Sequence, residues 1–384
     1  HRRRLTSFLS TSPIASLVPS RTYRDSRAWR SRPIGRGGGC SGFQYKFDLT
    51  DALEAPLMLT ISETVPRSEV ARRVEVVVRA PMQARKFHPG QFYRLQNFET
   101  DAATVEGTRL TMEGLALTGA WVDKEQGLLS LIVLEMGASS RQCAMLRPGQ
   151  KVVVMGPTGT PTEIPKGETV LLAGGGLGNA VLFSIAKALK AAGNRVVYFA
   201  GYKDGKDLFK REEIEEATDQ VIWSTDTGRE VEPRRPQDAH FRGNIVQAML
   251  AYAEGKLGAA VFDLREVDRV IAIGSDRMMA AVKAARHGVL SGHLKKEHVG
   301  VGSINSPMQC MMKEVCAQCL CKHVDPETGA ESFVFSCFNQ DQPLDHVDFA
   351  NLNARLRANT VQEKLSNLWL DLLLKESAQP ETPP

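Results

Sequence analysis

Four cysteines near the C-terminal end of the chain have the type and spacing to hold an iron-sulfur cluster: Cys310, Cys316, Cys319 and Cys337. The first three lie in one short loop, and Cys337 follows 18 residues after Cys319, directly behind the apolar run 333–335. A loop that supplies three thiolates and a later strand that supplies the fourth is a known way to ligate a 2Fe-2S cluster. The sequence therefore predicts such a cluster, and with it a protein that transfers electrons.

Two other interpretations of these thiols remain open. Four thiolates also bind zinc, but structural zinc sites usually carry two separated Cys-x-x-Cys pairs, and only Cys316 and Cys319 form one here. The cysteines could also bind no metal. Cys321 lies two residues beyond Cys319 and is an alternative ligand.

Composition places the chain among multidomain proteins without a membrane span. It has 384 residues, of which 42% are hydrophobic and 24% charged, and no run of 18 apolar residues. The net charge of +4 comes from nine arginines among the first 36 residues, where Asp25 is the one acid. This charge describes a tail, so no nucleic-acid partner is expected. Residues 1–53 are predicted to be an extended Arg-rich tail or linker, the end of a longer polypeptide.

The cysteine count also bears on the compartment. Seven cysteines, an odd number and mostly clustered, favour a reducing environment over a disulfide framework. We therefore expect a cytoplasmic protein. The mitochondrial matrix is the alternative, because the Arg-rich, acid-poor beginning resembles a transit peptide.

Two folding patterns follow the tail. Residues 54–165 contain short apolar runs broken by turn residues, which predicts a small antiparallel β-barrel. Residues 166–302 alternate strands with helices, which predicts an α/β domain with a parallel sheet. The expected fold is therefore multidomain, with an iron-sulfur domain over 303–349 and a C-terminal helix over 350–384.

A glycine cluster at the first strand-to-helix turn of the α/β region is suited to binding a nucleotide. It comprises Gly174, Gly175, Gly176 and Gly178. Glycines there let backbone N–H groups approach a pyrophosphate. Asn179 stands where a third motif glycine would fall, so a simple tight turn is the alternative. A second strand-to-helix loop, at Gly274, is expected to face the same cleft.

Over nearly all of residues 54–349 the chain resembles the ferredoxin-NADP reductase superfamily. The resemblance is to the branch with the electron-transfer subunit of dihydroorotate dehydrogenase and the small subunit of NADH-dependent ferredoxin:NADP oxidoreductase. The matching stretches are 89–92, 117–118, 154–164, 173–178, 224–228, 273–274 with 278–279, and 303–305. The resemblance implies a flavin barrel, a nicotinamide domain and a 2Fe-2S domain, in that order.

The resemblance also implies roles for single residues. Leu115, Ala116, Leu117 and Thr118 correspond to the strand that contacts the flavin ring, with Thr118 as the catalytic residue near flavin N5. Gly137, Ser139 and Ser140 correspond to the loop that holds the flavin pyrophosphate. The nicotinamide nucleotide is expected to contact Asp226, Gly274 and the glycine cluster, and Cys310, Cys316, Cys319 and Cys337 to bind the cluster. Such a protein converts hydride transfer into single-electron transfer.

The chain departs from the family pattern in two places. The family usually carries an Arg and a Pro in the flavin motif, where this chain has Gly114 and Ala116. The missing guanidinium removes a phosphate partner, for which Arg109 or Arg141 could compensate. The first cysteine gap is also longer than in the closer relatives, so Cys310 is the least secure ligand.

The expected function is an oxidoreductase subunit that passes electrons between NAD(P)H, FAD and a 2Fe-2S cluster, to or from a larger flavin or iron-sulfur partner. The alternative is an iron-sulfur scaffold without flavin. Lys203 and Asp204 follow the second strand of the α/β region. A cation there favours the 2′-phosphate of NADP and an acid favours NAD, so both signals are present, and we expect NAD. An amphipathic stripe near the C-terminus, from Val361 to Leu373, is expected to dock on a partner, with the capping of its own domain as the alternative.

Overall fold

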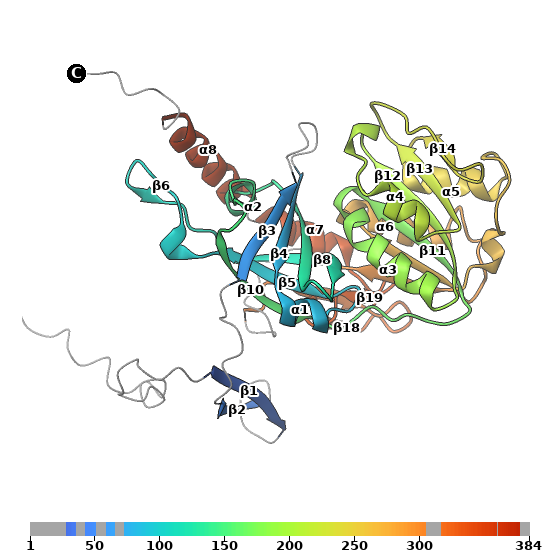
Figure 1. Cartoon of the computed structure of the whole chain (residues 1–384). Coiled ribbons are helices and arrows are strands. Elements are labelled where there is room, and N and C mark those ends of the chain that lie inside the picture. The colour runs from blue at the N-terminus through green and yellow to red at the C-terminus, as the bar shows by residue number, and fades with distance from the viewer. Residues whose placement is uncertain are drawn as a thin grey trace, which may run out of the picture. The chain divides into compact units, whose positions relative to one another are not determined.

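The computed structural model describes residues 28–35, 43–50, 59–65, 73–304, 316–358 and 360–376 (Figure 1). Cys310 lies outside the described residues. The chain divides into two compact units, His1–Leu57 and Met58–Pro384. In the first unit, strand β1 (Ala28–Gly35) pairs in antiparallel register with β2 (Phe43–Thr50). These strands lie in the stretch for which the sequence predicts an extended tail.

The first part of the second unit is a closed barrel of six antiparallel strands, in the order β10-β3-β4-β9-β8-β5. These strands are β3 (Leu59–Val65), β4 (Arg73–Arg79), β5 (Phe92–Asn97), β8 (Leu115–Asp123), β9 (Leu128–Leu134) and β10 (Lys151–Thr158). Alternate residues such as Val76, Val78 and Leu131 fill its core, as a period of two requires. The predicted antiparallel barrel is therefore confirmed.

Short elements connect the barrel strands. They are helix α1 (Pro81–Lys86), the 3₁₀ turn η1 (Glu99–Asp101), the small hairpin of β6 (Thr104–Val105) and β7 (Thr108–Arg109), and helix α2 (Ala138–Cys143). Helix α2 follows β9 and leads into β10, so the loop before it lies at the end of a barrel strand.

The second part is a seven-stranded sheet in the order β14-β13-β12-β11-β15-β16-β19. Neighbouring strands run parallel except for β19, which pairs antiparallel with β16. The strands are β11 (Thr169–Gly175), β12 (Arg195–Tyr202), β13 (Gln220–Thr225), β14 (Ala239–Arg242), β15 (Arg269–Ile273), β16 (Val299–Ser303) and β19 (Asp341–Pro343). The strand order reverses between β11 and β15, and such a switch point leaves a crevice at the carboxyl ends of the strands.

Helices cover both faces of this sheet, so the predicted α/β architecture is also confirmed. Helices α3 (Asn179–Ala191) and α4 (Arg211–Glu216) pack on one face. Helices α5 (Ile245–Ala253), α6 (Asp276–His287) and α7 (Phe349–Ala358) pack on the other. The 3₁₀ turns are η2 (Gly176–Gly178), η3 (Gly205–Asp207) and η4 (Leu264–Glu266). The strands are buried on both faces, which explains why they read as continuous apolar runs.

The C-terminal part returns to both preceding regions. Strands β17 (Leu320–Val324) and β18 (Glu331–Phe335) form a separate hairpin, and β19 then joins the large sheet. The last helix, α8 (Thr360–Glu376), lies beside α2 on the barrel (Figure 1). Among the described residues, no helix is both long and apolar enough to span a membrane.

Candidate functional site

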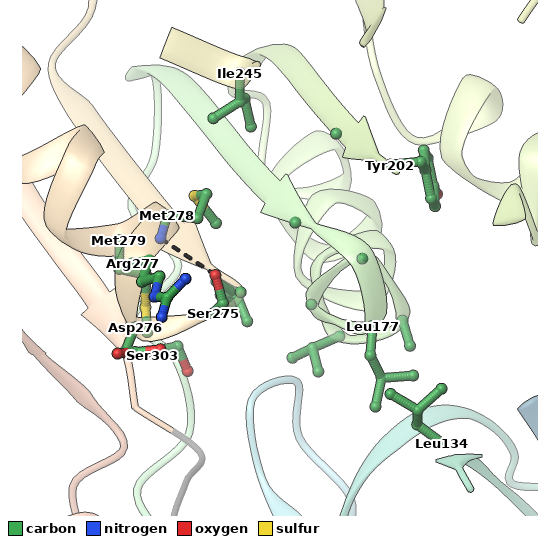
Figure 2. Close-up of a pocket in the computed structure, with 18 of the residues that line it drawn as sticks. Leu134, Leu177, Tyr202, Ile245, Ser275, Asp276, Arg277, Met278, Met279 and Ser303 are labelled. Carbon is green, nitrogen blue, oxygen red and sulfur yellow. Dashed lines mark hydrogen bonds between the residues drawn. The ribbon is translucent and has the colours of Figure 1, made fainter. Parts of the chain in front are cut away.

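A cavity of about 1100 Å³ lies at the switch point of the parallel sheet. Its walls come from the ends of β11, β12, β13 and β15, from barrel strands β8 and β9, and from helix α7. Figure 2 shows the glycine loop of β11 facing the Ser275–Met279 turn, with Tyr202 and Leu134 on other sides of the space. The cavity therefore lies between the α/β sheet and the barrel, with residues of both in its lining.

The glycine loop is held in place by Asn179, which replaces the expected third glycine. Asn179 is fully buried, and its side-chain nitrogen donates hydrogen bonds to the carbonyl oxygens of Gly176 (3.1 Å) and Gly201 (3.3 Å). Its Oδ1 accepts a hydrogen bond from the Tyr198 hydroxyl at 2.9 Å. The side chain thus ties the end of β11 to the end of β12. A buried amide with these partners fixes the loop shape that a glycine would only permit.

Gly178 is the position of closest approach between the two strand-end loops. A Cβ at Gly178 would lie 2.2 Å from the carbonyl oxygen of Ile273 and 3.0 Å from the backbone nitrogen of Gly274. Gly176 instead has a φ of +54° and no neighbour within 4 Å of its Cβ position. Packing therefore requires glycine at position 178, and backbone conformation favours it at position 176.

The second loop begins helix α6 with a side-chain cap. The Ser275 hydroxyl accepts a hydrogen bond from the Met278 backbone N–H at 3.2 Å, drawn as the dashed line in Figure 2. Asp276 binds the side chain of Asn353 on α7 at 2.5 Å, which brings Leu352 and Leu356 to the cavity wall. None of these α7 contacts is visible in the sequence pattern.

The predicted flavin strand forms the barrel side of the cavity. Ala116, Leu117 and Thr118 line it, and Thr118 pairs with Phe92 of β5. Leu115 does not line it and packs partly against the barrel core. The sequence prediction for this strand thus places three of its four residues at the cavity.

The same strand contacts two of the predicted cluster ligands. Cys319 and Cys337 are 3% and 2% exposed and pack together with Phe92 as one buried group of side chains. Ala116 packs against this group. The Cys337 backbone N–H donates a hydrogen bond to Cys319 Sγ at 3.3 Å. Cys316 is half-buried and immediately precedes this turn. Two thiols therefore meet beside the strand that faces the cavity.

Cys321 lies in a different environment. It is 1% exposed and packs in the core of the large sheet with Leu344, Val347 and Leu352. Burial raises the pKa of its thiol to about 11. The Cys321 side chain thus belongs to the apolar core and does not pack with Cys319 and Cys337. Among the described residues, no three His, Cys, Asp or Glu side chains are gathered as a metal site.

The predicted pyrophosphate loop lies outside the cavity lining. Ser140 Oγ accepts hydrogen bonds from the backbone N–H groups of Met136 and Gly137, both at 2.9 Å. Ser139 Oγ accepts one from the Glu113 N–H at 3.0 Å. The loop is therefore tied to the beginning of the flavin strand, one residue before Gly114.

Helix α8 covers this loop. Asn367 Nδ2 donates to the Met136 carbonyl at 2.8 Å, and the Glu363 carboxylate lies beside Gly137. Arg141 Nη2 forms an ion pair with Asp371 at 2.5 Å, and its Nη1 donates to the Asn367 carbonyl at 3.2 Å. Leu370 and Leu373 pack on Leu110 beneath the helix. The apolar stripe thus covers part of its own chain, which is the alternative to partner docking that the sequence pattern leaves open.

Of the predicted nucleotide-binding residues, all except Gly174 line the cavity: Gly175, Gly176, Gly178, Asp226 and Gly274. A Cβ at Gly174 would meet Asn179 Oδ1, so Gly174 makes room for the Asn179 side chain. Lys203 lines the cavity, whereas Asp204 does not. Backbone N–H groups of Lys206 and Arg229 bind the Asp204 carboxylate and lower its pKa. Asp204 therefore stabilises a turn.

The architecture defines a class of proteins in which a β-barrel is joined to a dinucleotide-type α/β sheet across a cleft. No known family model matches the chain. It is 30% identical over 233 residues to the dihydroorotate dehydrogenase B (NAD(+)) electron transfer subunit homolog of Thermotoga maritima, a match that covers 60% of this chain and 72% of that protein. The chain belongs to the ferredoxin-NADP reductase superfamily.

Two further similarities concern the sequence and the fold. The chain is 31% identical over 293 residues to an uncharacterized protein of Rickettsia prowazekii. This match covers 76% of this chain but 31% of that protein. The chain thus spans about a third of the length of this relative. In fold it is similar to a chain from the solved structure of an NADH-dependent reduced ferredoxin-NADP oxidoreductase, with a TM-score of 0.64 and 24% identity. That likeness covers 83% of this chain and 99% of the other.

Proposed function

We propose that the protein is an electron-transfer subunit of an NAD(P)H-linked oxidoreductase complex. In this proposal it passes electrons between a nicotinamide nucleotide, FAD and a 2Fe-2S cluster, and exchanges them with a larger redox partner. The proposed domains are the flavin barrel over 54–165, the nucleotide domain over 166–302, the iron-sulfur domain over 303–349 and a docking helix over 350–384.

One observation carries the proposal. Strand β8 contributes Ala116, Leu117 and Thr118 to the cavity, and Ala116 also packs against the cluster of Cys319, Cys337 and Phe92. The glycine loops of β11 and β15 line the same cavity. These loops would hold the nucleotide, β8 the flavin and the cysteines the iron-sulfur cluster. The flavin would then lie between the nucleotide and the cluster, in contact with both. Such an arrangement is what a relay between two-electron and one-electron carriers requires.

The residues present fit a dinucleotide in the α/β part. Gly175, Gly176 and Gly178 present backbone without side chains, and the Ser275 cap opens helix α6 at the opposing loop. Both features are those by which strand-end loops receive a diphosphate. Lys203 and Asp226 line the cavity at neighbouring strand ends, and we retain NAD as the proposed nucleotide, with NADP as the alternative.

The flavin and the cluster are also supported by this chain's own residues. Thr118 would stand beside the flavin ring, and Gly137, Ser139 and Ser140 near its phosphates. Cys316, Cys319 and Cys337, with Cys310, would hold the irons. Bound FAD accepts a hydride and releases its electrons singly, and a 2Fe-2S cluster carries one at a time. The buried contact of Cys319 with Phe92 would exclude water between the two groups.

The exposed face of α8 supports a protein partner. Four apolar side chains of the predicted stripe lie in solvent: Val361, Leu365, Leu368 and Trp369, which are 69%, 61%, 65% and 47% exposed. Leu373, the fifth, is 7% exposed and packs on the barrel. A stripe left in solvent beside the predicted flavin loop fits the docking of a larger flavin or iron-sulfur subunit.

An anaerobic titration of the purified protein with NADH, followed by its visible spectrum, tests the proposal. Flavin and iron assays accompany it. Bleaching of both the flavin and the cluster bands would support the electron-transfer subunit. A protein that holds a cluster but neither takes up FAD nor responds to NADH or NADPH would instead favour the flavin-free scaffold, to which Gly114 and Ala116 first pointed.

A further inference from the structure

The space above Gly114 is filled by an arginine from the neighbouring strand. Gly114 is buried, and a Cβ built on it would lie 1.7 Å from Arg94 Nε and 2.6 Å from Arg94 Nη2. The guanidinium of Arg94 therefore occupies the volume into which a side chain at position 114 would project. This is the position, directly before β8, at which the superfamily resemblance implies an arginine.

Arg94 lies on the outer face of the barrel, next to the predicted flavin strand. It pairs with Ala116 of β8 and with Met155 of β10, whereas its neighbours Tyr93 and Leu95 point into the barrel core. Because side chains alternate along a strand, Arg94 and Phe92 share the outer face. Phe92 contacts the buried cysteines on that face. Arg94 is thus directed to the same side as the flavin-facing residues.

The Arg94 side chain has an unused hydrogen-bonding group. In the described part of the chain its Nε is buried and has no hydrogen-bond partner, while Nη1 contacts Met155 Sδ at 3.6 Å. Arg94 as a whole is partly exposed, but a buried N–H donor without an acceptor is costly, and native sites normally supply one. The orphaned N–H and the fork of the guanidinium suit a phosphate.

The two arginines that the sequence suggests as replacements are placed differently. Arg141 is held by Asp371 and Asn367 of α8. Arg109 is exposed on the small β6–β7 hairpin. Neither occupies the space at Gly114, whereas Arg94 does.

We propose that Arg94 binds a phosphate of FAD and so replaces, from β5, the arginine that is missing at position 114. This inference rests on the proposed function, because it concerns the flavin of that site. The Glu113 N–H, one residue before Gly114, contacts Ser139 of the predicted pyrophosphate loop at 3.0 Å. Arg94 and that loop would therefore bind the same diphosphate. Gly114 is a glycine because a larger residue would displace the guanidinium.

The test is the affinity of flavin-stripped protein for FAD, measured by flavin fluorescence, with riboflavin as a second ligand that carries no phosphate. We expect Arg94→Ala to weaken FAD binding about 10- to 100-fold and to leave riboflavin binding unchanged, since it removes a charge-assisted phosphate contact. Arg79→Ala removes an exposed arginine from β4 and is the matched control, with an expected change below about twofold.

Two variants at position 114 separate binding from folding. Gly114→Ala should weaken FAD binding in the wild-type background but have no further effect beside Arg94→Ala. The double variant Arg94→Ala/Gly114→Arg should recover much of the lost affinity, because it moves the guanidinium to position 114. Thermal melting without flavin shows whether each variant is folded.

The outcomes distinguish this inference from the proposed function. A wild-type protein that binds neither flavin would refute the flavin site itself. A wild-type protein that binds FAD, together with folded Arg94→Ala that binds it equally well, refutes only the role of Arg94. Equal losses of FAD and riboflavin affinity also contradict a phosphate contact.

Discussion

Replacement of Gly178 by alanine tests how the two strand-end loops form the nucleotide site. The added Cβ would lie 2.2 Å from the Ile273 carbonyl oxygen, whereas real Cβ contacts stay above 3.0 Å, so the loops must separate by 3.0 − 2.2 = 0.8 Å. The obstacle is backbone on a buried strand, which cannot rotate away. Overpacking of this kind costs about 1–3 kcal/mol.

The expected result is a loss of both stability and nucleotide affinity. Separation of Gly178 from Ile273 widens the space in which a diphosphate would contact backbone N–H groups. We therefore expect the affinity for NADH to fall by about tenfold or more. Urea unfolding gives the free energy of unfolding, and calorimetric titration with NADH gives the affinity.

Gly193→Ala is the matched control. Gly193 also lies in this domain and has a φ of +83°, but nothing lies within 4 Å of its Cβ position. The Gly193→Ala variant should lose about 1 kcal/mol of its free energy of unfolding through backbone strain alone, and it should keep its NADH affinity. If Gly178→Ala matches Gly193→Ala in both measurements, the contact with Ile273 does not position the loop.

Three further predictions concern other parts of the molecule. Cys319→Ser should abolish the visible absorption and iron content of a bound cluster while NADH binding persists, and Cys321→Ser should retain both; a normal cluster in the first variant contradicts the ligand assignment. Glu363→Gln should strengthen FAD binding about two- to fivefold, because it removes a carboxylate beside Gly137, and unchanged affinity in a fluorescence titration would show that α8 does not oppose the flavin phosphates. Asp341→Asn should stabilise the protein by about 1 kcal/mol at neutral pH and not at pH 3. Burial raises the pKa of the Asp341 carboxyl above 3.8, more than the Thr162 and Ser303 hydroxyls lower it, so folding favours the protonated form and stability falls as pH rises past about 4. Urea unfolding at several pH values measures this, and an equal effect at pH 3 and 7 contradicts it.

The regular elements were predictable because their signals are local. The apolar run at residues 170–173 lies within β11, and the stretch 245–253, which is rich in alanine and large apolar residues, forms α5. Strands β14, β16 and β19 have no comparable local signal. Strand β14 has four residues and β19 three, and β16 contains two glycines, so each has a weak local pattern and is defined by pairing with a neighbour.

The cysteine region shows where local reasoning ends. Cys319 and Cys321 are two residues apart, a spacing that would place both on one side of a strand. Strand β17 begins only at Leu320, after Ala317 has adopted a φ of +56°. The two thiols consequently enter different clusters, one beside Phe92 and one in the core of the sheet. Only the turn geometry separates them.

The sequence by itself determined the order of the parts, the glycine loop after β11 and the set of candidate thiols, because each depends on residues close together in the chain. The tertiary structure decided which side chains meet. It brought Arg94 over Gly114, α8 over the loop at Gly137, and Gly178 against Ile273. These contacts join segments that are distant in sequence, and they depend on strand register and helix packing, which no local pattern encodes.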